Sequence, residues 1–142
     1  MIRWIAPALV AIAASSLALA APTVGKLAPQ FTVTDTNGKS QSLSDFKGKT
    51  VVLEWTNDGC PYVKKHYGAG NMQKLQKEVV AAGGIWLSII SSAPGKQGYV
   101  TGAEANTLTA ARGASPTAVL LDPAGAIGRA YEAQTTPHMF VI

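Results

Sequence analysis

The sequence contains a single cysteine, Cys60, among 142 residues. A chain with one cysteine cannot form an internal disulfide, so Cys60 is either an inert buried thiol or a residue kept for its reactivity. Charged residues are also few, at 14% against 47% hydrophobic residues, and this balance excludes an intrinsically disordered chain. The length fits one domain around one hydrophobic core.

A long uninterrupted apolar span is missing too, although residues 1–21 are strongly apolar. They carry one positive charge at Arg3, an apolar run over residues 4–14 and the small-residue pattern of residues 18–20. These features predict a secretory signal peptide that is removed on export to a secreted or periplasmic location. An uncleaved membrane anchor is the alternative, but Pro7 makes the span poor for a bilayer. We expect no membrane contact after cleavage.

Clustered positive charge is scarce. The formal net charge of +4 falls to +3 when the signal segment and its Arg3 are removed. The basic residues are scattered apart from Lys64 and Lys65, and no arginine cluster is interleaved with aromatic residues. We therefore expect no nucleic-acid partner.

Residues 22–142 show the patterning of alternating strands and helices. Residues 50–56 are β-branched and almost continuously apolar, which is typical of a central strand covered on both faces. An amphipathic helix is predicted over residues 62–82, with a break near residues 68–70. The other expected elements are a hairpin over 31–43, strands over 85–90 and 117–121, and helical segments over 101–112 and 126–133. This order predicts an α/β layered sandwich.

The last segment, residues 135–142, turns at Pro137 and begins another strand. A strand that ends the sequence has no partner after it. The prediction is a C-terminally incomplete domain over residues 22–142, which lacks a closing hairpin strand and a final helix.

Cys60 stands between a central strand and a helix that begins at Pro61. Only the thiolate is nucleophilic, and amide donors at a helix N-terminus favour that anion. Lys64 and Lys65 could add a favourable field, but exposed solvated lysines are the preferred interpretation. Asp58 is expected to cap the helix, with tuning of the cysteine as the alternative. The competing interpretation of Cys60 is a buried structural thiol.

Residues 54–63 and 135–142 together resemble the thioredoxin-like redoxins of the alkyl hydroperoxide reductase and thiol-specific antioxidant (peroxiredoxin-like) family. The similarity runs from about Gly25 to Ile142. It implies a thioredoxin-like three-layer sandwich with a mixed central sheet and a catalytic Cys60. It also implies a cis peptide bond before Pro137. The residues that it implies for substrate or partner binding are Trp55, Pro61, Tyr62, Thr136 and Pro137.

The sequence departs from two motifs of that superfamily. Val63 stands where thioredoxins carry a second, resolving cysteine, so an external thiol has to complete the cycle. Leu53 and Asn57 occupy the proline and threonine positions of the peroxiredoxin motif, and Pro137 falls where its arginine would lie. Donors that stabilise charge during peroxide reduction are therefore missing from those positions.

The expected function is an exported thiol oxidoreductase that uses Cys60 alone. Its partners would be an external thiol reductant or a disulfide-bearing protein, with hydroperoxide as the other candidate substrate, and no cofactor is expected. A hydroperoxide reductase with an antioxidant role is one alternative. The other is a non-enzymatic copper protein with Cys60, His66 and His138 as ligands.

Overall fold

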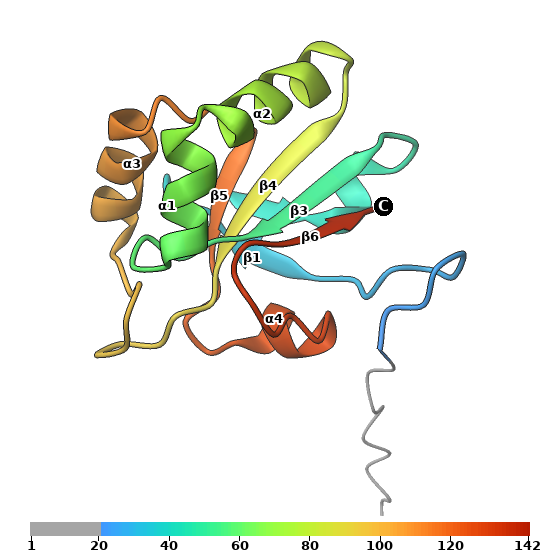
Figure 1. The fold of residues 1–142 in the computed structure, drawn as a ribbon. Coiled ribbons are helices and arrows are strands. Elements are labelled where there is room, and N and C mark those ends of the chain that lie inside the picture. Colours follow the sequence, from blue (N-terminus) through green and yellow to red (C-terminus); the bar gives the residue numbers. More distant parts are fainter. Residues whose placement is uncertain (1–20) are drawn as a thin grey trace, which may run out of the picture.

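The computed structural model describes residues 21–142 (Figure 1). The predicted signal segment lies outside the described residues except for Ala21. Among the described helices, none is both long and apolar enough to cross a bilayer.

A four-stranded mixed sheet forms the middle of the molecule, in the order β5-β4-β3-β6. Its three parallel strands are β3 (Val51–Trp55), β4 (Ile85–Ile90) and β5 (Ala118–Leu121). β6 (His138–Val141) runs antiparallel to β3. All five residues of β3 are buried, which confirms the predicted central strand.

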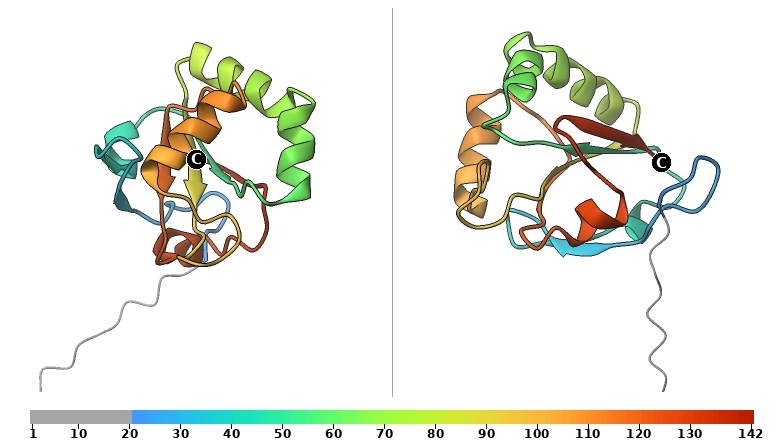
Figure 2. Two further views of the ribbon diagram at one scale, coloured as in Figure 1. Left: turned by 90° about the vertical axis from the view of Figure 1, so that its left-hand side faces the viewer. Right: turned by 60° about the horizontal axis from the view of Figure 1, so that its bottom comes forward.

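Helices cover one face of this sheet, as Figures 1 and 2 show. They are α1 (Pro61–Gly68), α2 (Asn71–Ala81) and α3 (Gly102–Ala111). The opposite face carries α4 (Ala126–Ala130) and a small antiparallel hairpin of β1 (Thr32–Thr34) and β2 (Ser40–Ser42), followed by the 3-10 turn η1 (Leu43–Phe46). The predicted three-layer arrangement with a mixed central sheet is therefore confirmed.

Short-range sequence signals fixed several boundaries. The predicted break in the long helix separates α1 from α2 at Gly70, whose φ of 70° is a left-handed conformation that glycine adopts easily. At the start of α3, Thr101 and Glu104 form a capping box, in which each side chain accepts a hydrogen bond from the other residue's backbone amide. The expected helix over residues 126–133 is shorter than predicted, because α4 ends at Ala130.

The two faces of β3 differ in character. Leu53 and Trp55 join an apolar core that includes Tyr131 on the α4 side. Val52 faces α1 and α2, where it packs with a cluster that Cys60 also borders. The thiol therefore lies at the edge of the core layer between the sheet and α1.

Candidate functional site around Cys60

Cys60 closes a tight turn at the carboxyl end of β3. Its amide donates to the Asn57 carbonyl at 3.0 Å, and the Gly59 amide donates to Asn57 Oδ1 at 2.8 Å. Cys60 is the N-cap residue of α1, and Pro61 is in the first turn of that helix. The thiol is partly exposed. This confirms the predicted position at a helix start and excludes the interpretation as a fully buried structural thiol.

The start of β6 brings a distant segment to the sulfur. The thiol Sγ lies 3.1 Å from the carbonyl oxygen of Thr136, which is 76 residues away in sequence. The peptide bond between Thr136 and Pro137 is cis, as the resemblance implied. The antiparallel pairing of β6 with β3 places this bend beside the turn, because Trp55 and His138 are register partners.

Hydrogen-bond donors set the charge state of the sulfur. A hydrogen bond from the Thr136 side chain, followed by the backbone amides of Val63 and Tyr62, lowers the pKa of the Cys60 thiol, while burial opposes this. The Thr136 carbonyl favours the protonated thiol and so raises its pKa, because only the protonated thiol can donate a hydrogen bond to it. The net shift of the Cys60 pKa is downward, and a lowered pKa enlarges the thiolate fraction at neutral pH.

The residues predicted to bind a partner fall into two groups. Pro61 and Tyr62 are exposed, and Thr136 and Pro137 are partly exposed, so all four are accessible beside Cys60. Trp55 is only 3% exposed, and its indole N–H donates to Ser91 Oγ at 3.1 Å. Trp55 is therefore largely a core residue that also borders the groove beside Thr136, and its role in partner binding stays a prediction.

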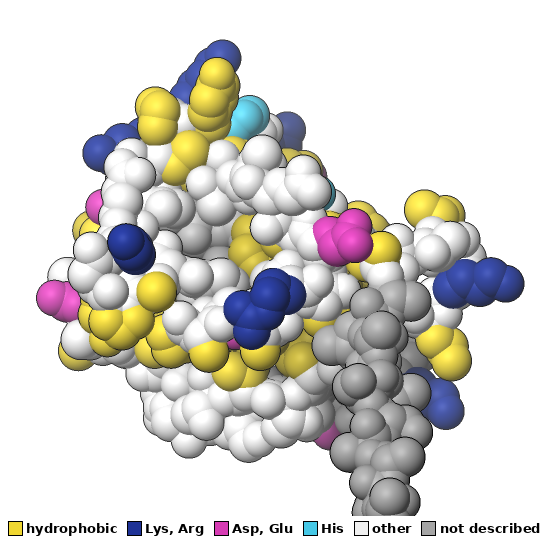
Figure 3. Space-filling view, turned by 90° about the horizontal axis from the view of Figure 1, so that it is seen from below, with side chains coloured by type: hydrophobic (Ala, Val, Ile, Leu, Met, Phe, Trp, Pro, Cys, Tyr) yellow, Lys and Arg dark blue, Asp and Glu magenta, His cyan; other side chains and the backbone are white. Residues whose placement is uncertain are grey.

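A groove of about 280 Å³ borders this bend. Its walls are residues 55–57, 91–92 and 133–136, and none of them carries a charged side chain. The space-filling view from below shows a hollow bounded mainly by uncharged polar side chains and backbone (Figure 3). Such a groove suits an uncharged extended chain better than a charged ligand.

The copper alternative is not supported by the geometry. Among residues 21–142, no three histidine, cysteine or acidic side chains gather as a metal-binding group. His66 Nδ1 lies 3.2 Å from Asn71 Nδ2, and the His138 ring stacks on Phe140 with 4.6 Å between ring centroids. Cys60, His66 and His138 are thus engaged separately, since residues six apart on a helix do not share a face.

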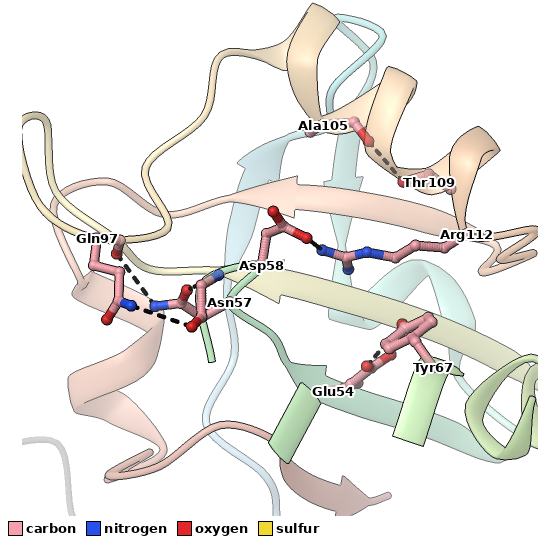
Figure 4. Close-up of polar contacts among 9 residues, drawn as sticks. Glu54, Asn57, Asp58, Tyr67, Gln97, Ala105, Thr109 and Arg112 are labelled. Carbon is pink, nitrogen blue, oxygen red and sulfur yellow. Dashed lines mark hydrogen bonds and ion pairs between the residues drawn. The ribbon is translucent and has the colours of Figure 1, made fainter. Parts of the chain in front are cut away.

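Asp58 does not cap α1, contrary to expectation. Its carboxylate pairs with the guanidinium of Arg112 at the end of α3, 54 residues away (Figure 4). Arg112 also lies over the Tyr67 ring, with its guanidinium carbon 4.9 Å from the ring centroid. No local pattern predicts these contacts, because α3 reaches the turn only through tertiary packing.

Glu54 is the other residue that sequence reasoning missed. It is fully buried on β3 and accepts hydrogen bonds from Tyr67 Oη at 2.8 Å and Trp86 Nε1 at 2.8 Å. Ser88 Oγ at 2.9 Å and Gln76 Nε2 at 3.3 Å complete its partners. Burial, with the charge of Glu54, raises the pKa of Tyr67. The sequence signal that points to Glu54 is its charged side chain inside an otherwise apolar strand.

The loop after β4 packs against the cysteine turn. Gln97 Nε2 donates to the Gly59 carbonyl at 3.2 Å, and Asn57 Nδ2 donates to the Gln97 carbonyl at 3.2 Å (Figure 4). A Cβ on Gly98 would lie 2.3 Å from the Asn57 side chain, so this close approach requires glycine. The turn is thus held from two sides, by Gln97 and by Arg112.

Comparison with known families agrees with this geometry. A model of the AhpC/TSA family matches residues 24–142. The chain belongs to the AhpC/TSA family. It is therefore a thioredoxin-like redoxin. No curated protein sequence matches it.

Several solved structures share the fold of this redoxin. An uncharacterized conserved protein from Geobacillus kaustophilus has a TM-score of 0.73 and 23% identity over 83% of this chain, which spans 62% of that protein. A putative thiol:disulfide interchange protein DsbE from Chlorobium tepidum has a TM-score of 0.63 and 24% identity over 81% of this chain and 74% of its own.

The exposed lipoprotein thioredoxin Etrx1 from Streptococcus pneumoniae has a TM-score of 0.59. It is 25% identical over 80% of this chain and 81% of its own. These likenesses establish the thioredoxin fold of the redoxin.

Proposed function

We propose that this redoxin is an exported monothiol oxidoreductase that exchanges thiols and disulfides with partner proteins. One observation carries the proposal: the Cys60 sulfur sits at the N-terminus of α1, where the Thr136 side chain and the amides of Val63 and Tyr62 lower its pKa. A thiol of lowered pKa both attacks at neutral pH and leaves readily.

The reaction needs one sulfur on the enzyme and two on the substrate. The Cys60 thiolate attacks one sulfur of a partner disulfide, a mixed disulfide forms, and the second partner sulfur leaves as a thiolate. An external thiolate then attacks the partner's sulfur in the mixed disulfide and releases the Cys60 thiolate. Because Val63 occupies the place of a resolving cysteine, the second step depends on this external thiol.

The surroundings of Cys60 suit a protein partner. Tyr62, at 67% exposure, offers an aromatic contact next to the sulfur. The uncharged groove beside Thr136 offers a place for an extended segment. The apolar pattern of residues 1–21 supports export, and two structural neighbours are named an exposed lipoprotein and a secreted oxidoreductase.

Hydroperoxide is the second candidate substrate, favoured by the family match. In that reaction the thiolate attacks one peroxide oxygen, the O–O bond breaks, the other oxygen leaves as an alcohol or water, and Cys60 becomes a sulfenic acid. One external thiol condenses with the sulfenic acid to a mixed disulfide and releases water, and a second thiol then frees Cys60. Arg112 does not act as a free cation here, because Asp58 and Tyr67 hold its guanidinium.

The test measures Cys60 ionisation and then its products. Thiolate absorbance against pH should give a midpoint below the ordinary value of about 8.5. Incubation with a disulfide-bearing protein should give a mixed disulfide at Cys60 by mass spectrometry, which glutathione then releases. Cys60→Ser is the control and should give no adduct. A sulfenic acid without any mixed disulfide would favour the peroxide reaction, and no adduct of either kind would refute both.

A further inference from the structure

The turn that carries Cys60 depends on a residue from a distant helix. Asn57 and Gln97 hold one side of the turn through the hydrogen bonds described above. Asp58 forms the other side and points toward Arg112 (Figure 4). Asp58 lies two residues before Cys60, inside the turn that the Cys60 amide closes on the Asn57 carbonyl.

Arg112 connects four elements at this point. It is the C-cap residue of α3, and its guanidinium pairs with Asp58 and lies over the Tyr67 ring of α1. Its carbonyl accepts a hydrogen bond from Gln73 Nε2 of α2 at 2.8 Å. One residue therefore fixes the cysteine turn relative to all three helices on this face.

This ion pair differs from an ordinary surface pair. Exposed pairs contribute little, since two flexible side chains must be ordered in water. The Arg112 side chain is only 19% exposed and is already confined against Tyr67, while the Asp58 side chain is 43% exposed. Pairing thus orders Asp58 against a preformed partner, at a lower cost in side-chain entropy.

We propose that Arg112 is the positioning residue of the Cys60 turn, which it orients through Asp58 so that the sulfur lies at the start of α1 and 3.1 Å from the Thr136 carbonyl oxygen. This inference rests on the proposed function of Cys60. Arg112 acts through Asp58 and does not touch the sulfur. Loss of the pair frees the turn to move, and the thiolate then loses part of its hydrogen bonding.

Other titratable groups on the elements around Cys60 remain unchanged in the test variants. They are Tyr62, Lys64, Lys65 and His66 on α1, Lys96 in the loop after β4, His138 on β6, and the buried pair of Tyr67 and Glu54. A change in the pH profile then reports on the Asp58–Arg112 pair.

The experiment measures the rate of Cys60 alkylation by iodoacetamide, a neutral reagent, across pH. Arg112→Gln should raise the midpoint by about 0.5 pH, which is about a threefold loss of thiolate well below the midpoint. Arg112→Lys should recover most of this loss. Arg129→Gln is the matched control, because Arg129 donates to the Ala124 carbonyl on the opposite face, and it should leave the midpoint unchanged.

Asp58→Asn separates positioning from simple charge effects. Removal of a negative charge near a thiolate would by itself lower the midpoint, whereas loss of the pair raises it. We expect a rise, as in Arg112→Gln, with native circular dichroism. Asp58 is partly exposed, so this variant also serves if Arg112→Gln fails to fold.

The two proposals fail in different ways. A wild-type midpoint at or above the ordinary thiol value overturns the proposed function of Cys60. A low wild-type midpoint that Asp58→Asn lowers, or that both variants leave unchanged, overturns only the positioning role of Arg112. An equal rise in Arg129→Gln also overturns it.

Discussion

The two faces of the central sheet are built from different interactions. On the α4 side, Trp55, Tyr131 and Phe140 pack ring against ring, with centroids 5.3 to 5.5 Å apart. On the α1 side, the buried carboxyl group of Glu54 collects four side-chain donors. Aromatic packing tolerates small rotations, but hydrogen bonds to one carboxyl group require fixed directions. The face that carries Cys60 is therefore the one whose geometry is held by directional contacts.

The largest expected effect comes from removal of an aromatic ring. Tyr131→Ala on the α4 side should lower the free energy of unfolding by about 3–5 kcal/mol, because it leaves a cavity in the core. The Cys60 ionisation midpoint, measured at low temperature in the folded state, should stay unchanged. Urea unfolding and thiolate absorbance check the two halves of this prediction. A shifted midpoint would show that the aromatic packing on the α4 side also influences the ionisation of Cys60.

The next effect concerns the polar face. Glu54→Gln keeps the shape but replaces one acceptor oxygen with a donor among four donors, so we expect a loss of about 2–3 kcal/mol in the free energy of unfolding. Urea denaturation measures it. Glu78→Gln is the control: this exposed residue pairs only with Lys74 at 3.9 Å, and its change should cost little. Similar losses of unfolding free energy in Glu54→Gln and Glu78→Gln would contradict a stabilising role of the hydrogen bonds to Glu54.

A matched pair of hydroxyl deletions sharpens the comparison. Tyr67→Phe removes a hydrogen bond to the carboxyl group of Glu54, and Tyr131→Phe removes one to the Pro29 carbonyl at 2.7 Å. We expect losses of about 2 and about 1 kcal/mol, because bonds to charged groups are stronger. Thermal or urea unfolding of both variants checks the order. A larger loss in Tyr131→Phe than in Tyr67→Phe would contradict the stronger hydrogen bonding on the face that carries Glu54.

The last effect appears only at high pH. Burial raises the pKa of Tyr131 from 10.0 to about 12. Because the phenol ionises more readily in the unfolded chain, its raised pKa in the folded protein contributes stability that is fully present below about pH 10. This stability is lost as the pH rises from about 10 to about 12. The free energy of unfolding should fall over that interval, and less steeply in Tyr131→Phe. Urea titrations at several alkaline pH values test this, and an equal fall in both proteins would exclude Tyr131 as the cause.

Local patterns were enough to predict much of the fold and the central residue of the site. The apolar run of β3, the glycine break before α2 and the helix start at Pro61 all appeared where expected. The resemblance supplied the cis bond before Pro137. The closing strand and final helix that the sequence was expected to lack stay a prediction.

Residue roles that depend on distant partners were missed or wrong. Asp58 was expected to cap α1, because aspartate before a helix often does so, but Arg112 holds it instead. The place of Glu54 in a strand predicts no special role for it, since its donors come from α1, α2 and β4.

The sequence by itself determined the elements and the helix start at Cys60, because turns, caps and periodicity depend on neighbours only a few residues away. The family followed from the resemblance of residues 54–63 and 135–142 to known redoxins. The tertiary structure decided which donors reach the sulfur and which cation holds its turn. Thr136 and Arg112 lie 76 and 54 residues from Cys60 and Asp58. Contacts over such separations exist only after the sheet and helices have packed, so no local pattern contains them.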